Sequence, residues 1–313
     1  MASISAGFWR STFNLSRHFP SSLISSRPSF SRARFSRSSA AMDSGDDLRS
    51  KFMEFPYVSG SHRALMVDIL STVETRLGSS LESCTLPPDV QQFENSTGSA
   101  RGSLHLRSGL PSSQIDFVLG GWIHCELPSG EALNITTLSA YLKPSTDAPH
   151  FLLDLIQIGP TSLVLILDLT PRKDLILYPD YLKKYYEDTN LDRHRVHIHG
   201  LPEAKPYHSP SLYVRAVLSP TAILVSVGAE RSVEDVIRDH VWPVAREVLD
   251  FWIGSCLCAV GNVGAKERDY LARRDGIIKR TTVEVDLGSS FPRLFGQEVA
   301  DRVLGVLSGY YGK

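Results

Sequence analysis

The most apolar stretch of the chain covers residues 151–169, where two hydrophobic runs flank a short polar turn. The runs, 151–158 and 163–169, each have the length of a β-strand, and Gly159-Pro160-Thr161-Ser162 supplies turn residues between them. The pattern predicts a β-hairpin near the middle of a sheet.

Two aspartates interrupt this hairpin. Because side chains alternate along a strand, Asp154 shares one face with Leu152 and Ile156, and Asp168 repeats the pattern on the second run. If the two aspartates pair, their carboxylates face each other, and a register change of one residue places them on opposite faces. Each is either an acid whose pKa is raised by burial, and so a proton donor, or a strand-end cap that accepts a backbone N–H; the sequence leaves both open.

Period-two alternation predicts further strands at 103–107, 115–127 and 132–141. Because these strands follow one another with short turns and no helix between them, a mainly antiparallel sheet is favoured. Gly120-Gly121 within the second strand indicates a bulge or the close approach of another segment. The aromatic segment 51–59 is expected to lie across the core.

Apolar residues at helical spacing predict helices over 61–77, 181–187, 232–260, 266–279 and 291–311. Pro243 is expected to kink the third of these. Residues 193–200 are interpreted as a charged connection, and 207–218 with 222–227 as another hairpin. The predicted fold class is α/β (α+β): an α/β/α sandwich with a central, mainly antiparallel sheet flanked by helices.

Charge is unevenly distributed along the 313 residues. Residues 1–41 hold six arginines, no lysine and no acid, and are rich in serine, which is typical of an organelle transit peptide. The predicted domains are therefore a transit peptide at 1–41 and a single domain at 42–313. Without those six arginines, 27 basic groups remain against 34 acidic ones, a net charge of −7, so nucleic acid is not an expected partner. No apolar run has membrane-spanning length, so the protein is not expected to span a membrane.

Common cofactor signatures are missing from the sequence. It has neither a G-x-G-x-x-G after a strand nor a Walker A loop, so no bound nicotinamide, flavin or ATP is predicted. The four cysteines are interpreted as reduced, buried thiols. A metal site is suggested by three histidines close together, His194, His197 and His199. Arg193 and Arg195 beside them would repel a cation, so a solvated loop is favoured.

Asp286 precedes the predicted last helix. By itself, an acid in a loop that enters a helix is most simply an N-terminal cap or a charge partner of that helix.

Several motifs in order along the chain resemble the red chlorophyll catabolite reductase family of plant chloroplasts. They are KFMEFPYV (51–58), IDFV (115–118) with GWIHC (121–125), LNIT (133–136), LVLILDL (163–169), RKD (172–174), PDYL (179–182) and FPRLFG (291–296). The similarity runs over about 51–306. That family is akin to the ferredoxin-dependent bilin reductases, whose α/β/α sandwich agrees with the fold predicted above.

The resemblance implies reduction of red chlorophyll catabolite, an open-chain tetrapyrrole, at its C20/C1 bridge to primary fluorescent chlorophyll catabolite. It implies a stromal chloroplast enzyme and homodimer that takes electrons from reduced ferredoxin and holds no organic cofactor or metal. The resemblance is also compatible with association with other chlorophyll-breakdown enzymes.

The resemblance also carries over to particular residues. Asp154 and Asp286 match the two pocket carboxylates of the family; the usual residue at the first position is Glu, so the acid here is one methylene shorter. Leu218 matches a pocket position that influences product stereochemistry. Trp122 and His124 share a strand face and are candidates to contact the pigment, although a structural role for the histidine is an equal alternative.

Docking of an acidic ferredoxin requires a basic surface. One candidate set is Arg172, Lys173, Lys183, Lys184, Arg193 and Arg195; the other is Arg273, Arg274, Lys279 and Arg280. Two functions other than a reductase stay open. A non-catalytic tetrapyrrole carrier is favoured by the exchange of Glu for Asp154, and a protein for other hydrophobic ligands is the third possibility.

Overall fold

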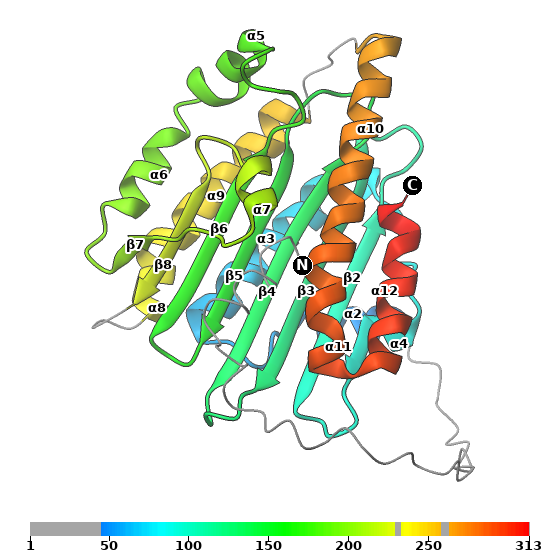
Figure 1. Ribbon diagram of the computed structural model, residues 1–313, viewed down its shortest axis with the longest axis vertical. Helices are drawn as coiled ribbons and strands as arrows, with labels where there is room; N and C mark the ends of the chain where they lie inside the picture. The colour runs from blue at the N-terminus through cyan, green and yellow to red at the C-terminus, as the bar shows by residue number, and fades with distance from the viewer. Residues whose placement is uncertain (1–44, 229–232, 258–262, 313) are drawn as a thin grey trace.

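One eight-stranded antiparallel sheet organises the computed structural model, which describes residues 45–228, 233–257 and 263–312 (Figure 1). The strand order is β1-β2-β3-β4-β5-β6-β8-β7. The strands are β1 (Gln92–Glu94), β2 (Ala100–Ser108), β3 (Ile115–Glu126), β4 (Ala132–Leu142), β5 (His150–Ile158), β6 (Ser162–Thr170), β7 (Ala204–Pro206) and β8 (Ile223–Gly228). The predicted transit segment 1–41 lies outside the described residues.

Helices cover one face of the sheet and bury a first core against it. They are α2 (Gly45–Met53), α3 (Gly60–Leu77) with the 3₁₀ turn η2 (Gly78–Ser80), α5 (Pro179–Leu182), η3 (Lys183–Glu187), α6 (Asp192–His199), α8 (Val233–Val236), η4 (Ile237–Val241), α9 (Trp242–Phe251) and η5 (Trp252–Cys256). From the sheet, this core includes Leu153, Leu155 and Leu165.

A second core lies on the other face, which α10, α11 and α12 cover in the near layer of Figure 1. The elements of this face are α4 (Pro88–Gln91), α7 (Leu212–Val217), α10 (Ala265–Thr281), η6 (Thr282–Leu287), α11 (Gly288–Phe295) and α12 (Gln297–Tyr311). The sheet contributes Leu152, Ile156 and Ile166 to it. Because β5 and β6 are buried on both faces, they read as nearly continuous apolar runs. The predicted sandwich is confirmed.

The predicted hairpin is formed by β5 and β6, which turn at Gly159 with a positive φ of 59°. Asp154 lies opposite Ile166, and Asp168 lies opposite Leu152. The aspartates are therefore not directly paired, but the register keeps both on the same face of the sheet, in diagonal positions.

Two predicted segments have different structures. The expected strand at 207–218 contains helix α7, because the Ser211 side chain accepts the Val214 N–H at 3.3 Å and caps the helix. The expected charged connection at 193–200 lies within helix α6, which buries His194 and Ile198, four residues apart.

Within the described residues, the long helix predicted at 232–260 is a succession of α and π segments. A π-helical turn, η4, ends two residues before Pro243, which lacks the N–H that a regular α-helix would use there. The helix predicted at 291–311 is two helices, α11 and α12, separated by Gly296 with a φ of 79°.

Gly120 on β3 marks a close approach, one of the two alternatives predicted for Gly120-Gly121. A Cβ at Gly120 would lie 2.9 Å from Cζ of Phe52 and 3.0 Å from Cδ2 of Leu70. Phe52 lies on α2, in the aromatic segment that was expected across the core, and it is buried. The observed irregularity of the β3–β4 register lies elsewhere, between Ile115 and Phe117.

We expect Gly120→Ala to lower the free energy of unfolding by about 1–3 kcal/mol, because a methyl group there overpacks the first core. Urea unfolding measures the change. Gly305→Ala is the matched control: a Cβ at Gly305 on α12 would meet nothing within 4 Å, so stability should stay equal or rise. Equal stability of Gly120→Ala and the wild type would contradict the packing argument.

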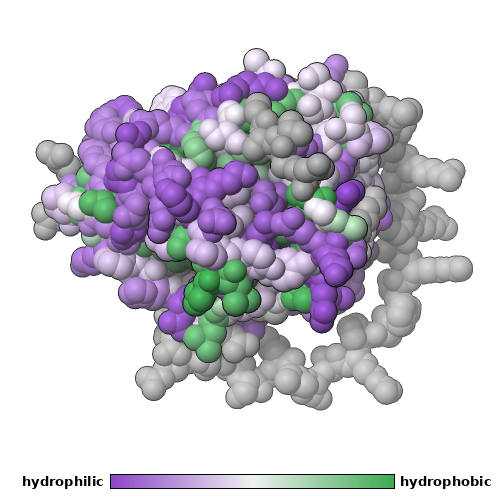
Figure 2. All heavy atoms as spheres, turned by 90° about the horizontal axis from the view of Figure 1, so that it is seen from above, coloured by the Kyte–Doolittle hydropathy of each residue, from purple (hydrophilic) through white to green (hydrophobic). Residues whose placement is uncertain are grey.

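The end of the molecule formed by α5 and the start of α10 is largely hydrophilic, with a hydrophobic patch within it (Figure 2). Near α5, Ile176 and Leu177 are 89% and 75% exposed, and the Asp174 carboxylate fixes their turn by accepting both of their backbone N–H groups. Among the described helices, none is both long and apolar enough to cross a membrane.

Candidate functional site

Asp154 lies in the middle of the sheet and faces the second core. Its side chain is 2% exposed and accepts a hydrogen bond from the hydroxyl of Thr137, the residue opposite it on β4. Burial raises the pKa of Asp154, since the charged form is poorly solvated there, and the Thr137 hydrogen bond acts in the opposite direction. A carboxyl in this position favours the protonated form, as a proton donor requires.

Two tyrosines lie near Asp154. Tyr141 on β4 and Tyr311 at the end of α12 have ring centroids 5.7 Å apart. Burial raises the pKa of both phenols, so the hydroxyls stay neutral. Asp154 is thus enclosed between the sheet and the C-terminal helices.

Asp168 is the second buried acid of this face. Its carboxylate accepts the Ser219 hydroxyl at 2.5 Å, the Ser219 N–H at 3.1 Å and the Thr170 hydroxyl at 3.3 Å. Burial raises the pKa of Asp168 to about 6, against the lowering effect of these donors. The hypothesis that a buried aspartate of the hairpin accepts a backbone N–H is confirmed for Asp168, which accepts the Ser219 N–H.

Asp168 should give the stability a specific pH dependence. Its folded-state pKa of about 6 exceeds the ordinary value of 3.8, so between these values the native state holds the proton more tightly than the unfolded chain does. The contribution of Asp168 to stability therefore falls as the pH rises from 3.8 to about 6. From the size of the shift, we expect the free energy of unfolding of the wild type to fall by about 2 kcal/mol relative to Asp168→Asn between pH 4 and pH 7. Urea unfolding of both proteins at the two pH values measures this; a constant difference would contradict it.

Asp286 lies in η6, between α10 and α11, and its side chain is outside what the structure describes. The expected loop is thus a π-helical segment. It does not cap α11 either, because Leu287 is the residue at the N-cap of that helix. Since η6 contributes Val283 and Leu287 to the second core, Asp154 and the backbone of Asp286 lie on the same side of the sheet.

Leu218 directly follows α7 and borders a small cavity of about 30 Å³ on this side of the sheet. The other lining residues come from β4, β5, β6, α7, α10 and η6: Ser139, Tyr141, His150, Phe151, Leu152, Thr170, Val217, Ile278 and Thr282. A cavity of this size holds about one water molecule. The helices therefore lie close against the sheet in this structure.

A buried ionic cluster adjoins this cavity, because its member His150 lines the cavity. Asp275 on α10 accepts hydrogen bonds from Arg172 at 2.5 and 3.1 Å, and His150 Nε2 lies 3.2 Å from it. Burial would raise the pKa of Asp275, but His150 and Arg172 outweigh it and hold that pKa far below its usual range. Burial lowers the pKa of His150 to about 4, and its Nδ1 accepts the Leu142 N–H at 3.1 Å, so the ring is neutral. Sequence reasoning missed His150 and Asp275, because nothing in their spacing links residues this far apart.

The structure separates Trp122 and His124 from Asp154. Trp122 pairs with Thr136, which pairs with Leu155, so both candidates lie on the face of the first core, opposite Asp154. His124 stacks on Tyr57 with ring centroids 4.0 Å apart, and its Nδ1 lies 2.8 Å from Oδ1 of Asn134, which fits the structural alternative.

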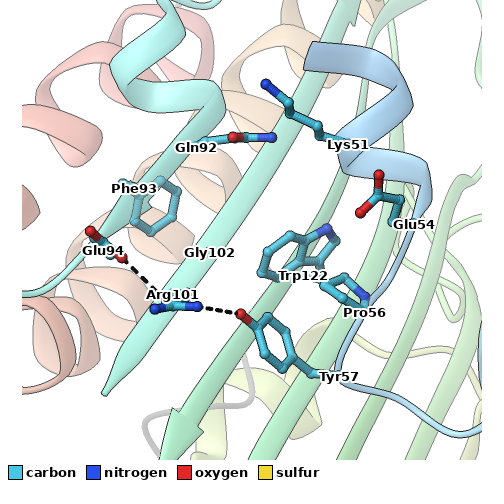
Figure 3. A pocket seen from close by; sticks show the side chains of 10 residues that line it. All are labelled: Lys51, Glu54, Pro56, Tyr57, Gln92, Phe93, Glu94, Arg101, Gly102 and Trp122. Atoms are coloured by element: carbon cyan, nitrogen blue, oxygen red, sulfur yellow. Dashed lines mark hydrogen bonds and ion pairs between the residues drawn. The ribbon is translucent and has the colours of Figure 1, made fainter. Parts of the chain in front are cut away.

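Trp122 instead borders a separate open cleft of about 510 Å³ (Figure 3). The Arg101 guanidinium in this cleft donates to the Tyr57 hydroxyl at 3.0 Å and pairs with Glu94 at 3.2 Å. Its charge is thus compensated within the cleft.

The first candidate basic surface is largely neutralised by acidic partners. Arg172 is fully buried, which corrects its assignment to a docking surface, and Lys173 is nearly so and pairs with Asp147 and Glu267. In the second set, Lys279 is buried and pairs with Asp116.

The other basic residues of the first set mostly pair with acids: Lys183 with Asp188, Arg193 with Glu247 and Arg195 with Asp192. Arg273 and Arg280 stay exposed on α10.

The described residues include no group of three or more His, Cys, Asp or Glu side chains placed to hold a metal ion. His197 Nε2 lies 3.2 Å from His240 Nδ1 instead. Cys125 and Cys256 are buried free thiols, as predicted, Cys84 is half-buried, and Cys258 lies outside the described residues.

Comparison with known proteins gives one family. The family model described as red chlorophyll catabolite reductase (RCC reductase) matches residues 61–309. The chloroplastic red chlorophyll catabolite reductase of Arabidopsis thaliana is 53% identical over 275 residues, which cover 86% of each chain. The chloroplastic red chlorophyll catabolite reductase 1 of Oryza sativa subsp. japonica is 43% identical, over 82% of this chain and 79% of the relative.

The fold has a solved counterpart in tomato phytochromobilin synthase, crystallised in complex with biliverdin. The match covers 80% of this chain and 83% of the synthase chain, with a TM-score of 0.63 and 17% sequence identity. The bilin-reductase-like fold expected from the sequence is confirmed. The chain belongs to the red chlorophyll catabolite reductase family.

Proposed function

We propose that this protein reduces red chlorophyll catabolite to primary fluorescent chlorophyll catabolite, with reduced ferredoxin as the electron donor. The observation that carries the proposal is Asp154, a buried acid of raised pKa that faces the C-terminal helices on the same side of the sheet as Leu218 and η6. Membership of the family supports the substrate.

In this reaction the pigment is itself the electron acceptor. Two ferredoxins deliver one electron each, and two protons join them, so the C20–C1 double bond becomes a single bond and each carbon gains one hydrogen. The protein holds the pigment, excludes water and directs the protons.

We assign the first proton to Asp154 and the second to Asp286. Thr137 orients the Asp154 carboxyl through its hydrogen bond, and the neutral phenols of Tyr141 and Tyr311 add no competing charge. Because Asp154 is one methylene shorter than the Glu usual in the family, the pigment must lie closer to β5.

The pigment must also enter. Four pyrrole rings do not fit a cavity of about 30 Å³, so we propose that α7 moves outward on binding. This helix has six residues, and Val214 is its one buried residue, whereas Leu212 is 72% exposed. It is therefore held more weakly than the long helices beside it.

Electron entry is proposed at α10, where Arg273 and Arg280 are exposed while Ile278 lines the cavity from the same helix. An acidic donor docked there would lie close to the pigment. The proposed location is the chloroplast stroma, with 1–41 as the transit peptide and 42–313 as one reductase domain. In support, the Arabidopsis and rice relatives are named chloroplastic. A homodimer is proposed as well.

An anaerobic assay tests the function. The protein is mixed with red chlorophyll catabolite, ferredoxin and a system that reduces ferredoxin, and fluorescent product is expected. A parallel reaction without ferredoxin should yield none. Tight pigment binding without product in the complete system would favour the carrier instead, and binding of fatty ligands with no tetrapyrrole binding would favour the third function.

A further inference from the structure

We propose that Asp168 is a positioning residue that, through Ser219, fixes Leu218 in the wall of the pigment cavity and so controls the face from which the pigment is protonated. The inference rests on the proposed function for its substrate. Its structural basis is a set of hydrogen bonds at the end of the β6–β8 pairing.

Backbone hydrogen bonds to β6 do not fix the segment between Leu218 and the start of β8. The hydrogen-bonded pairing of β6 with β8 ends at Leu167 and Ile223, one residue before Asp168. Beyond that point the chain that leads back to Leu218 has no strand partner on β6. Asp168 replaces the missing pairing, because its carboxylate accepts both the hydroxyl and the N–H of Ser219, at 2.5 and 3.1 Å.

The Ser219 hydroxyl is held from its other side as well. It accepts the Thr221 N–H at 3.2 Å and lies 3.1 Å from the Thr221 hydroxyl, while the Ala222 N–H donates to the Ser219 carbonyl at 3.2 Å. Residues 219–222 thus form a closed turn with one fixed orientation towards Asp168.

Leu218 directly precedes this turn and has an extended backbone, with φ −76° and ψ 153°. On its other side is α7, which is short and largely exposed. The hydrogen bonds from Ser219 to Asp168 therefore fix the cavity wall at Leu218 more firmly than α7 does.

The β5–β6 hairpin carries the acid Asp154 and also Asp168, to which the cavity wall is bound through Ser219. Asp154 is on β5 and Asp168 on β6, on one face, with Asp154 opposite Ile166. The position of Leu218 relative to Asp154 is thus set by the β5–β6 register together with the Asp168–Ser219 bonds. A proton donor on the hairpin and a wall bound to the same hairpin determine which side of a planar pigment faces the acid.

The test compares Ser219→Ala, which removes the hydroxyl, with Ser219→Thr, which keeps it, and with Asp168→Asn. Gln157→Leu is the control, because Gln157 bonds His62 on the opposite face and its loss lowers stability without touching the cavity. Two quantities are measured: the ratio of product epimers and the circular dichroism induced in bound biliverdin, an open-chain tetrapyrrole that serves as the probe.

In Ser219→Ala and Asp168→Asn, we expect the ratio of major to minor epimer to fall about tenfold and the induced dichroism to change. Ser219→Thr and Gln157→Leu should keep the wild-type ratio and spectrum. If Ser219→Ala keeps the wild-type epimer ratio and the wild-type dichroism of bound biliverdin, the Asp168–Ser219 bonds have only a structural role. That result would overturn the inference. If the wild type yields no product, the proposed function fails, and the dichroism of bound biliverdin still decides on the role of the Asp168–Ser219 bonds; absence of biliverdin binding would contradict both.

Discussion

Asp154→Asn is expected to lower the rate of pigment reduction by about 10²–10⁴-fold, the contribution of a positioned general acid. The amide occupies the same space and still accepts the Thr137 hydroxyl, so pigment affinity should change little. Single-turnover fluorescence measures the rate, and titration with the pigment under anaerobic conditions measures the affinity. Asp286→Asn should behave in the same way if it supplies the second proton.

Asp154→Glu is the matched control, because it keeps the acid and restores the residue usual in the family. It should retain activity. A wild-type rate in Asp154→Asn would remove this carboxyl as a proton source, and parallel loss of rate and affinity would show that its role is binding instead.

Arg172→Met is expected to lower the free energy of unfolding by about 3–5 kcal/mol, the usual result when one partner of a buried ion pair is removed. Arg172 is fully buried, and besides Asp275 it donates to the carbonyl of Thr146 at 2.6 Å. Its removal leaves the Asp275 carboxylate buried with His150 as its remaining partner. Arg172→Lys should not restore stability, because an ammonium cannot reproduce the bidentate contact of the Arg172 guanidinium with the Asp275 carboxylate.

Urea unfolding of Arg172→Met, Asp275→Leu and the double variant measures the coupling between the two groups. The double variant should lose less stability than the sum of the single ones, since neither charge is then buried alone. Arg238→Met is the control: Arg238 pairs with Asp235 and Asp239 in solvent, and its loss should have no measurable effect. Additive losses would contradict the buried pair.

Strands β2 to β6 and β8 could be predicted from the sequence because alternation or an apolar run is bounded by turn residues, whereas the short strands β1 and β7 were not predicted. The β5–β6 hairpin is the clearest example: Gly159 marks its turn, and the apolar runs on either side follow from burial on both faces. The register could not be predicted, because a shift of two residues keeps the same side chains on the same face.

The sequence predicts a strand where α7 lies because apolar residues flank the turn residues Ser219-Pro220 on both sides, whereas the Ser211 cap decides the local structure. The burial of Arg172 also escaped prediction. A charged residue that follows a strand is usually solvated, and its partner Asp275 lies on a helix over 100 residues further along the chain.

Of the candidate site, the shared side of Asp154 and Leu218 agrees with the expectation from the sequence. Alternation within β3 places Trp122 and His124 on one face of their strand but does not tell which face of the sheet that is. Only the pairing across β4 shows that their face is the opposite one.

The π-helical turn η6 has a consequence for insertions and deletions. It joins α10 to α11 with a turn that takes up one residue more than an α-helical turn does. Deleting one residue from 282–287 would restore regular α-helical winding and leave α10 at nearly the same rotation about its axis relative to α11. Deleting one residue of α10 between Asp275 and η6, where no such turn takes up the change, would rotate Asp275 by roughly 100° away from Arg172. Relatives that keep this ion pair can therefore differ by one residue within 282–287, but not between Asp275 and this segment.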